Sequence, residues 1–280
     1  MTLTSLMSVS SAKQEAHHLS HAHALYKASF FGPFRVTREA LPLAEPTWRR
    51  NKARVLLKWF LLNPGDLFSM DQLCTLLWPD LSRKVATSNA HVTLHYLRHV
   101  LESELAAGCP STFIRHNRYN YYWFDLHDVW WTDVFDVQYL STHAREAERK
   151  GEFSRAIALS CQLVAYYNLT FLPEDIYEDM FSPYRRQHEY AYTQLLEHQL
   201  QLYTQTAQLD EALFCALHIL SVDPYSEDAV KMIVAIQLQQ GNNTGAIRQL
   251  DDFQNMLKED LSIKPGKELL ALRSSIMNAS

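Results

Sequence analysis

Cysteines and long apolar runs are scarce in this chain, and their scarcity excludes whole classes of protein. Among 280 residues there are four cysteines, Cys74, Cys109, Cys161 and Cys215, and no CxxC pair, so the sequence favours reduced thiols over a disulfide framework or a zinc centre. No stretch approaches the ~18 uninterrupted apolar residues of a membrane span, and no basic region followed by an apolar run opens the sequence. We therefore expect a cytoplasmic protein without a membrane contact.

Motifs of catalysis and cofactor binding are also missing. The sequence has no GxxxxGK[ST] phosphate loop and no HExxH zinc motif, and no Ser-His-Asp or Cys-His signature stands out. We expect no enzymatic activity, no cofactor and no resident metal.

The charges are distributed unevenly along the chain. Hydrophobic residues make up 47% and charged residues 20% of the sequence, which is enough for a buried core and, at this length, for two domains. Residues 25–125 carry more basic than acidic residues, whereas residues 126–280 are strongly acidic. This asymmetry is typical of a nucleic-acid-binding module joined to a protein-facing module. The polar, histidine-rich residues 1–24 are expected to be a disordered leader.

The first part of the basic region predicts a small sheet and two helices. "ALYKASFFGPFRVTREALPLAE" (24–45) mixes β-branched and aromatic residues with Gly-Pro and Leu-Pro breaks, as in short antiparallel strands. "TWRRNKARVLLKWFLLNPG" (47–65) places Ala53, Leu56, Leu57, Phe60 and Leu61 on one helix face. Ser69 and Gln72 have the spacing of a capping box that opens a second short helix.

A third helix is expected from about Lys84 to Glu104. Its apolar stripe must face a core and consists of Ala90, Leu94, Leu97 and Leu101. Polar and aromatic residues occupy the opposite side, which carries Ser88, Val92, His95, Tyr96 and His99. The histidines at 91, 95 and 99 share one face, as metal ligands can, but no carboxylate or cysteine stands nearby to complete a site. The pattern favours a face directed to solvent or to DNA.

A β-hairpin follows this helix. "TFIRHNRYNYYWFD" (112–125) reads as two strands around a turn at His116 to Asn120, with Arg115 and Arg118 near its tip. Most of its aromatic rings should be core, and Tyr119 is the best candidate for exposure and base stacking. A sheet, three helices and a hairpin are the elements of a winged helix in their order.

The acidic part of the chain predicts helices with an internal repeat. Three similar segments align at Ala156, Ala212 and Ala246, with Gly151, Ala207 and Gly241 five residues earlier. The last two alanines are 34 residues apart, which is the tetratricopeptide period. Small residues here should let paired helices approach closely, and stacked pairs leave a concave, protein-binding surface.

Two stretches bring a known family into view. "RNKARVLLKWFLLNPGDLFSMDQLCTLLWPD" (50–80) and "SNAHVTLHYLRHVLE" (88–102) resemble the winged-helix domain of OmpR-type response regulators, and more specifically the bacterial activators of the SARP/BTAD group. The resemblance continues through "DVWWTDVFDV" (128–137), where Asp133 matches the aspartate of the family's connector. It implies a mostly α-helical chain with a winged-helix DNA-binding domain at 25–125 and an all-α, tetratricopeptide-like bacterial transcriptional activation domain at 126–280.

The resemblance also implies a sequence-specific DNA-binding transcriptional regulator, most readily an activator. Helix 84–104 would read the major groove, and the wing at 113–124 would contact the DNA backbone. Asn89 is the candidate for a base contact because its amide can pair bidentately with adenine, and Arg115 and Arg118 are candidates for phosphate or minor-groove contacts. The full set of candidate DNA contacts is Ser88, Asn89, His91, Val92, Thr93, His95, Tyr96, Arg98, Arg115, Asn117, Arg118, Tyr119, Arg49 and Arg50.

Cations at the start of the first helix leave two interpretations open. Arg49, Arg50, Lys52 and Arg54 could contact phosphates, or they could form an ordinary solvated face.

The implied partners are double-stranded DNA, RNA polymerase, a second copy of the chain in a homodimer, and an unknown ligand or protein at the helical repeats. Relatives carry several arginines on the recognition helix, whereas this one offers Arg98 and histidines. Fewer cations predict a lower affinity and a shallower salt dependence. Because imidazole gains its charge as the pH falls through about 6.5, the histidines predict tighter binding at acidic pH. The alternative is an adaptor or ligand-sensing protein whose DNA-binding surface has degenerated and which acts through its helical repeats.

Overall fold

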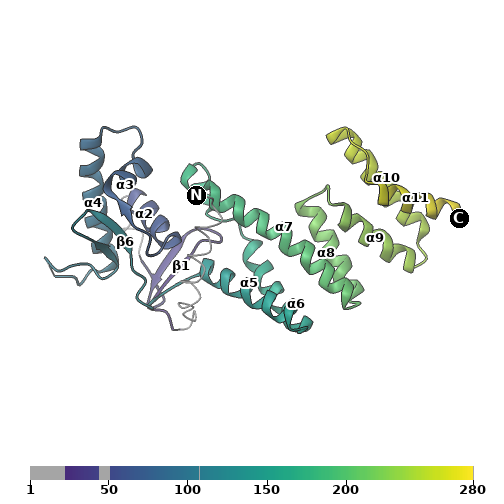
Figure 1. The fold of residues 1–280 in the computed structure, drawn as a ribbon, viewed down its shortest axis with the longest axis horizontal. Helices are drawn as coiled ribbons and strands as arrows, with labels where there is room; N and C mark the ends of the chain where they lie inside the picture. The colour runs from purple at the N-terminus through teal and green to yellow at the C-terminus, as the bar shows by residue number, and fades with distance from the viewer. Residues whose placement is uncertain (1–22, 44–50, 107, 280) are drawn as a thin grey trace. The chain divides into compact units, whose positions relative to one another are not determined.

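The computed structural model describes residues 23–43, 51–106 and 108–279, with elements labelled as in Figure 1. Two compact units divide the chain: the first comprises Met1–Tyr139 and Leu169–Ser182, and the second comprises Leu140–Asn168 and Pro183–Ser280. The predicted leader lies, apart from its last two residues, outside the described part of the chain.

A four-stranded sheet opens the first unit, and its strand β1 is labelled in Figure 1. Its strands, in spatial order, are β3 (Leu41–Pro42), β2 (Arg35–Arg38), β1 (Tyr26–Ser29) and β7 (Trp130–Thr132). The first three pair antiparallel, as predicted. Strand β7 pairs parallel with β1, a long-range pairing that local sequence patterns do not reveal.

Among the described residues, three helices and a hairpin complete this unit as a winged helix. The helices are α2 (Asn51–Leu62), α3 (Met70–Leu77) and α4 (Arg83–Leu101). A second sheet has the order β4 (Phe68–Ser69), β6 (Tyr121–Phe124) and β5 (Ile114–His116). The predicted apolar faces of α2 and α4 are confirmed, because every residue predicted for these two faces is at most 2% exposed.

The capping box at the start of α3 is also confirmed. The backbone N–H of Gln72 donates to Oγ of Ser69 at 3.2 Å, and the N–H of Ser69 donates to Oε1 of Gln72 at 2.8 Å. These two bonds satisfy donors that the first helical turn leaves without intrahelical partners.

The second unit is built from paired helices. Helix α5 (Asp133–Arg149) begins in the first unit and pairs with α6 (Phe153–Tyr167). The following pairs are α7 (Ser182–Gln205) with α8 (Leu209–Val222), and α9 (Glu227–Gln239) with α10 (Asn243–Met256). A π-helical turn, η5 (Leu257–Leu261), leads to α11 (Lys267–Ala279). The predicted fold class, a winged helix followed by all-α helical repeats, is confirmed.

The three repeats turn in the same way, for a reason other than the predicted one. Gly151, Ala207 and Gly241 have positive φ angles of 76°, 55° and 73°. At each turn the next residue donates its N–H back to the carbonyl five positions earlier, at 2.8 to 2.9 Å, as in a Schellman motif. A Cβ at Gly151 or Gly241 would meet nothing within 4 Å. These small residues therefore serve the left-handed backbone, and close helix approach is served by the repeat alanines, which are at most 1% exposed.

Residues 169–182 depart from the predicted division at residue 125. They follow α6 in the chain but pack in the first unit, with two 3₁₀ turns, η3 (Pro173–Asp175) and η4 (Asp179–Phe181). Phe171, Leu172 and Phe181 are at most 5% exposed, so burial of their side chains holds this segment in the first core. We call residues 169–182 the strap.

None of the helices in the described ranges has the length and apolar character needed to cross a membrane.

Candidate nucleic-acid interface

Helix α4 presents a polar face to solvent. His91 and His95 are exposed, Val92 is 42% exposed, and Asn89 and Tyr96 are half-buried. Ser88 is exposed one turn before Val92. These side chains share a helix whose other face fills the core, so the sequence pattern and the three-helix packing place them together on one surface.

Both ends of α4 are held by side-chain contacts. At its start, the guanidinium of Arg83 donates to both carboxylate oxygens of Asp71 on α3, at 3.0 and 2.7 Å. At its end, the hydroxyl of Tyr26 on β1 donates to the carbonyl oxygen of Leu101 at 2.6 Å. The Tyr26 ring stacks on Trp130 with centroids 4.6 Å apart. The exposed face of α4 is thereby fixed relative to the rest of the winged helix.

The prediction for Thr93 was wrong. Thr93 is only 3% exposed because it lies three residues after Ala90 and four before Leu97, on the buried side of the helix. Arg98 is half-buried, and its guanidinium makes a long hydrogen bond of 3.4 Å to the carbonyl of Ile114 on β5. It connects α4 to the hairpin, which is a positioning role.

The turn of the hairpin is shaped by Asn117. Its Oδ1 accepts the backbone N–H of Tyr119 at 2.9 Å and of Tyr121 at 3.2 Å. Asn120 has the left-handed φ of 58° that asparagine tolerates better than most residues. The amide oxygen of Asn117 is thus occupied within the wing, and only its NH₂ group is left for a ligand.

Cationic and aromatic side chains surround this turn. Arg115 and Arg118 are exposed, Tyr119 is 65% exposed, and the Arg118 guanidinium lies 4.9 Å from the centre of the Tyr119 ring. Sequence reasoning missed His116, an exposed neighbour that stacks on Tyr122 at 5.7 Å. It also missed Lys84, which is exposed in the first turn of α4. Its position beside the polar face of the predicted helix was the signal in the sequence that could have identified this cation.

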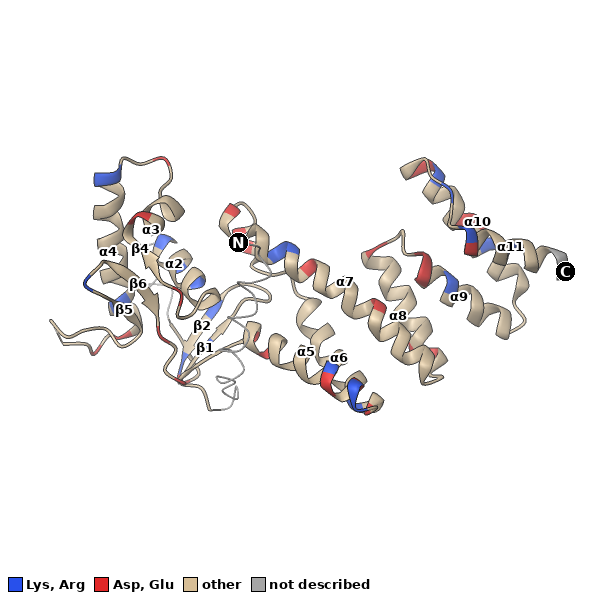
Figure 2. Ribbon diagram, in the orientation of Figure 1, with Lys and Arg blue, Asp and Glu red and all other residues tan. Residues whose placement is uncertain are grey.

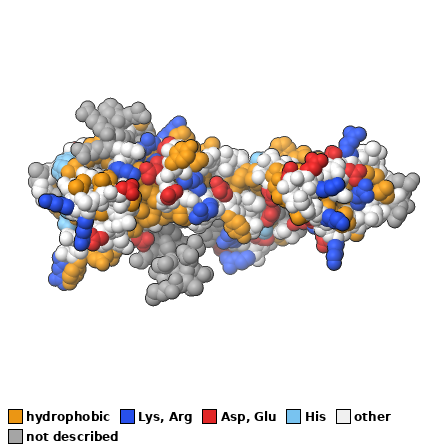
Figure 3. Space-filling model, turned by 90° about the horizontal axis from the view of Figure 1, so that it is seen from above, with side chains coloured by type: hydrophobic (Ala, Val, Ile, Leu, Met, Phe, Trp, Pro, Cys, Tyr) orange, Lys and Arg blue, Asp and Glu red, His pale blue; other side chains and the backbone are white. Residues whose placement is uncertain are grey.

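Basic side chains are found at two places beside the polar face of α4. Lys and Arg mark the start of α4 and the loop between β5 and β6 (Figure 2). The space-filling view shows histidine and basic side chains on the surface of the same unit, at the left of the image (Figure 3). Such a surface suits DNA. The cations at its two ends can contact phosphates, and the neutral polar groups between them can contact base edges.

The cations of α2 have intramolecular partners in the strap. Nζ of Lys52 lies 3.4 Å from Oε1 of Glu178, and the Arg54 guanidinium lies 3.3 Å from Oε1 of Glu174. Lys52 and Arg54 thus form ion pairs within the unit, which neither of the two interpretations described. Arg49 and Arg50 lie outside the described residues.

Asp133, the connector aspartate, is a buried structural group. Its carboxylate accepts the N–H of Phe30 at 2.9 and 2.7 Å and that of Phe31 at 2.9 Å. Burial nevertheless raises the pKa of Asp133 to about 7, against the opposing effect of these backbone donors. The residue joins the start of α5 to the end of β1.

The α4 histidines are arranged as a surface row. The rings of His95 and His99 meet edge to face with centroids 4.5 Å apart. Within the described ranges, no three His, Cys, Asp or Glu side chains are grouped as a metal site would require.

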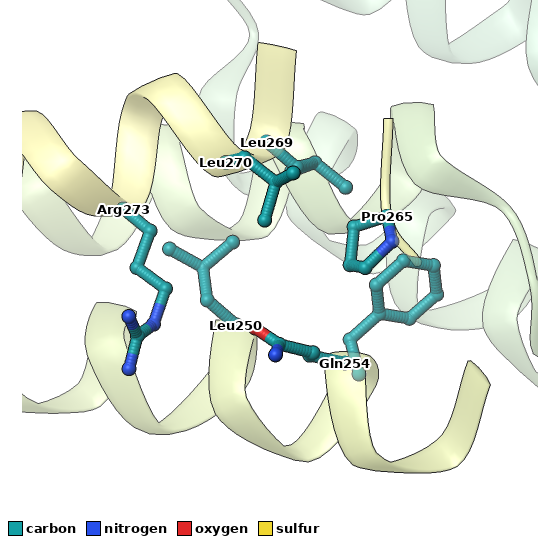
Figure 4. A pocket seen from close by; sticks show the side chains of 7 residues that line it. Leu250, Gln254, Pro265, Leu269, Leu270 and Arg273 are labelled. Carbon is teal, nitrogen blue, oxygen red and sulfur yellow. The ribbon is translucent and has the colours of Figure 1, made fainter. Parts of the chain in front are cut away.

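A shallow depression lies in the second unit between α10 and α11 (Figure 4). Its lining is mainly Leu250, Phe253, Pro265, Leu269 and Leu270, and these side chains enclose no space for even a water-sized ligand. Ligand pockets usually begin at roughly 300 Å³, and Nε of Arg273 at the rim of the depression already donates to Asp251 at 2.8 Å. We therefore place the candidate site on the winged helix.

The fold and this surface define a winged-helix protein that continues into helical repeats. The family model for the bacterial transcriptional activator domain matches residues 132–277, more than half of the chain. The chain therefore belongs to the SARP/BTAD family of bacterial transcriptional regulators.

A solved structure supports the fold across both units. It is titled Mycobacterium tuberculosis EmbR in complex with low affinity phosphopeptide, and it is 18% identical in sequence with a TM-score of 0.72. The similarity covers 91% of this chain but 66% of the EmbR chain, so this chain spans slightly less than two thirds of that protein. No curated protein matches the sequence.

Proposed function

We propose that the chain binds a specific double-stranded DNA sequence and activates transcription. The observation that carries this is the exposed polar face of α4, with Ser88, His91 and His95 exposed beside Asn89, flanked by Arg115 and Arg118 of the wing. A helix of this width fits the major groove of B-form DNA, where the side chains of polar residues can tell the base pairs apart.

In this proposal the residues of the winged helix divide the work. Asn89 and the exposed histidines contact base edges. Lys84, Arg115 and Arg118 contact phosphates. Tyr119 lies beside the place where the wing contacts the DNA backbone. Three such cations predict a log–log salt slope of about −3 for each bound chain, which is shallow for a DNA-binding protein.

The helical repeats are the proposed protein-facing part. Family membership supports a role for them in contacting RNA polymerase. We also propose that they pair two copies of the chain, since stacked helix pairs are suited to protein surfaces. An unknown ligand or partner protein could also act through this unit.

One observation favours the second candidate, an adaptor whose winged helix has lost DNA affinity. The arginines of α4 are engaged elsewhere: Arg83 pairs with Asp71, and Arg98 bonds to the backbone of β5. Apart from Lys84 in its first turn, the exposed face of α4 therefore presents histidines and uncharged polar side chains.

Selection of bound duplexes from a random DNA pool, followed by titration at several salt concentrations, separates the two. Enrichment of one sequence with a salt slope of about −3 per chain supports the regulator. Binding without an enriched sequence, or no binding at low salt, favours the adaptor.

A further inference from the structure

In the sequence, the strap lies between α6 and α7 of the repeat unit, but it belongs to the winged-helix unit. It follows α6 directly and continues into α7 at Ser182, yet it packs with the first unit. The strap therefore connects the start of α7, through the chain itself, to residues that are part of the winged-helix core.

Backbone bonds attach the first half of the strap to the end of β1. The N–H of Gly32 donates to the carbonyl of Thr170 at 2.8 Å, and the N–H of Leu172 donates to the carbonyl of Phe30 at 2.9 Å. The rings of Phe31 and Phe171 meet edge to face at 5.5 Å.

Ionic contacts attach the second half to α2. Lys58, only 1% exposed, pairs with Asp175 and also lies 3.0 Å from Oε1 of Glu174. The same oxygen of Glu174 accepts the backbone N–H of Phe34 at 2.9 Å. The pair between Lys52 and Glu178 extends the contact to the start of α2.

Helix α2 in turn packs against α4, the proposed recognition helix. The start of α7 is thus connected to the strap through the chain itself. The strap contacts α2 through charged side chains, and α2 contacts α4 through the core. The strap's two carboxylates at 174 and 178 are 30% and 32% exposed, so they can be neutralised without leaving a deeply buried charge.

We propose that the strap is a coupling element, through which a change at the start of α7 in the repeat unit reaches α2 of the winged helix. In this proposal the buried pair of Lys58 with Asp175 anchors the strap to α2, and the ionic contacts of Glu174 and Glu178 transmit the change to α2. The coupling is a property of the folded chain and does not depend on whether α4 binds DNA.

Hydrogen–deuterium exchange on the full chain tests the first step. Gln187→Gly loosens the early turns of α7, and Gln201→Gly is the matched control near its end; both glutamines are exposed. A glycine in a helix interior raises the equilibrium constant for local helix opening by about fivefold. Hydrogen exchange of the backbone N–H groups of Gly32 and Leu172 should become faster by about the same factor, and in Gln187→Gly only. No change, or an equal change in both variants, overturns the proposal.

The second step is tested by adding Glu174→Gln and Glu178→Gln to the Gln187→Gly chain. Faster exchange along α2 in Gln187→Gly should disappear in this background, while the effect at Leu172 remains. A response of α2 that persists without the two carboxylates shows that they do not carry the coupling.

Discussion

The carboxylate of Asp133 holds the backbone N–H of Phe30 with both oxygens, at 2.9 and 2.7 Å. It fixes the start of α5 to the strand at the centre of the N-terminal sheet. Because burial raises its pKa to about 7 from an ordinary value of 3.8, the folded chain holds a proton here that the unfolded chain releases between these values.

Asp133 should therefore make the first unit less stable as the pH rises from about 4 to 7, because the folded state must then accept a buried charge. Three pKa units correspond to roughly 4 kcal/mol at most. Unfolding of the wild type and of Asp133→Asn, followed at pH 4 and pH 8, should show the wild type losing stability relative to the variant. Asp80→Asn, at an exposed carboxylate of the same unit, is the control. A stability difference that is equal at both pH values contradicts the assignment.

Lys58 and Asp175 form a buried ion pair, with side chains 1% and 6% exposed. Lys58→Met should lower the free energy of unfolding by about 3–5 kcal/mol, because it takes one partner from a buried pair and leaves the charge of the Asp175 carboxylate in place. The double variant Lys58→Met with Asp175→Leu should recover most of this loss. Lys52→Met removes a half-exposed pair and should cost less than about 1 kcal/mol. Urea titrations of the four chains measure these values, and a double variant no better than Lys58→Met alone would refute the pairing argument.

Arg115 and Arg118 in the wing are predicted to contact phosphates. Replacing either by alanine should weaken DNA binding by a similar factor for every sequence and reduce the salt slope by about one. Filter binding with the selected duplex and with an unrelated duplex gives both quantities. A loss confined to the selected duplex would instead assign these arginines to base recognition.

Asn89 is predicted to read one base pair. Asn89→Ala should cost about 1–3 kcal/mol on the selected sequence and should relax the preference at one position only. Thr93→Val is the matched control one turn further on, since Thr93 is buried and its hydroxyl should not reach DNA. If Asn89→Ala binds like the wild type, α4 is placed wrongly in the groove.

His91 and His95 are exposed on the face of α4 that we propose reads DNA. The double variant His91→Gln with His95→Gln should bind the selected duplex more weakly than the wild type, because it changes two of the exposed side chains on this face. His23→Gln, at an exposed histidine of the same unit, is the control and should bind like the wild type. Equal affinity of the double variant and the wild type in filter binding removes the two histidines from the contact.

Local patterns in the sequence were sufficient for most of the elements. The apolar stripe of α4, the capping box of Ser69 and Gln72, the turn of the wing with its left-handed Asn120, and the alanine register of the repeats all follow from spacings of a few residues. Such signals are local because helix and turn geometry is set by neighbours within four or five positions.

Tertiary structure decided which polar residues are available to a ligand. Thr93 is buried because the helix rotates it toward the core, and Asn117 uses its oxygen to form the wing's turn. Lys52 and Arg54 are paired because residues more than a hundred positions later fold back onto α2. The sequence determined the winged helix, the repeats and the family; the return of the strap and the parallel pairing of β7 depend on contacts between distant residues, for which a single sequence carries no periodic signal.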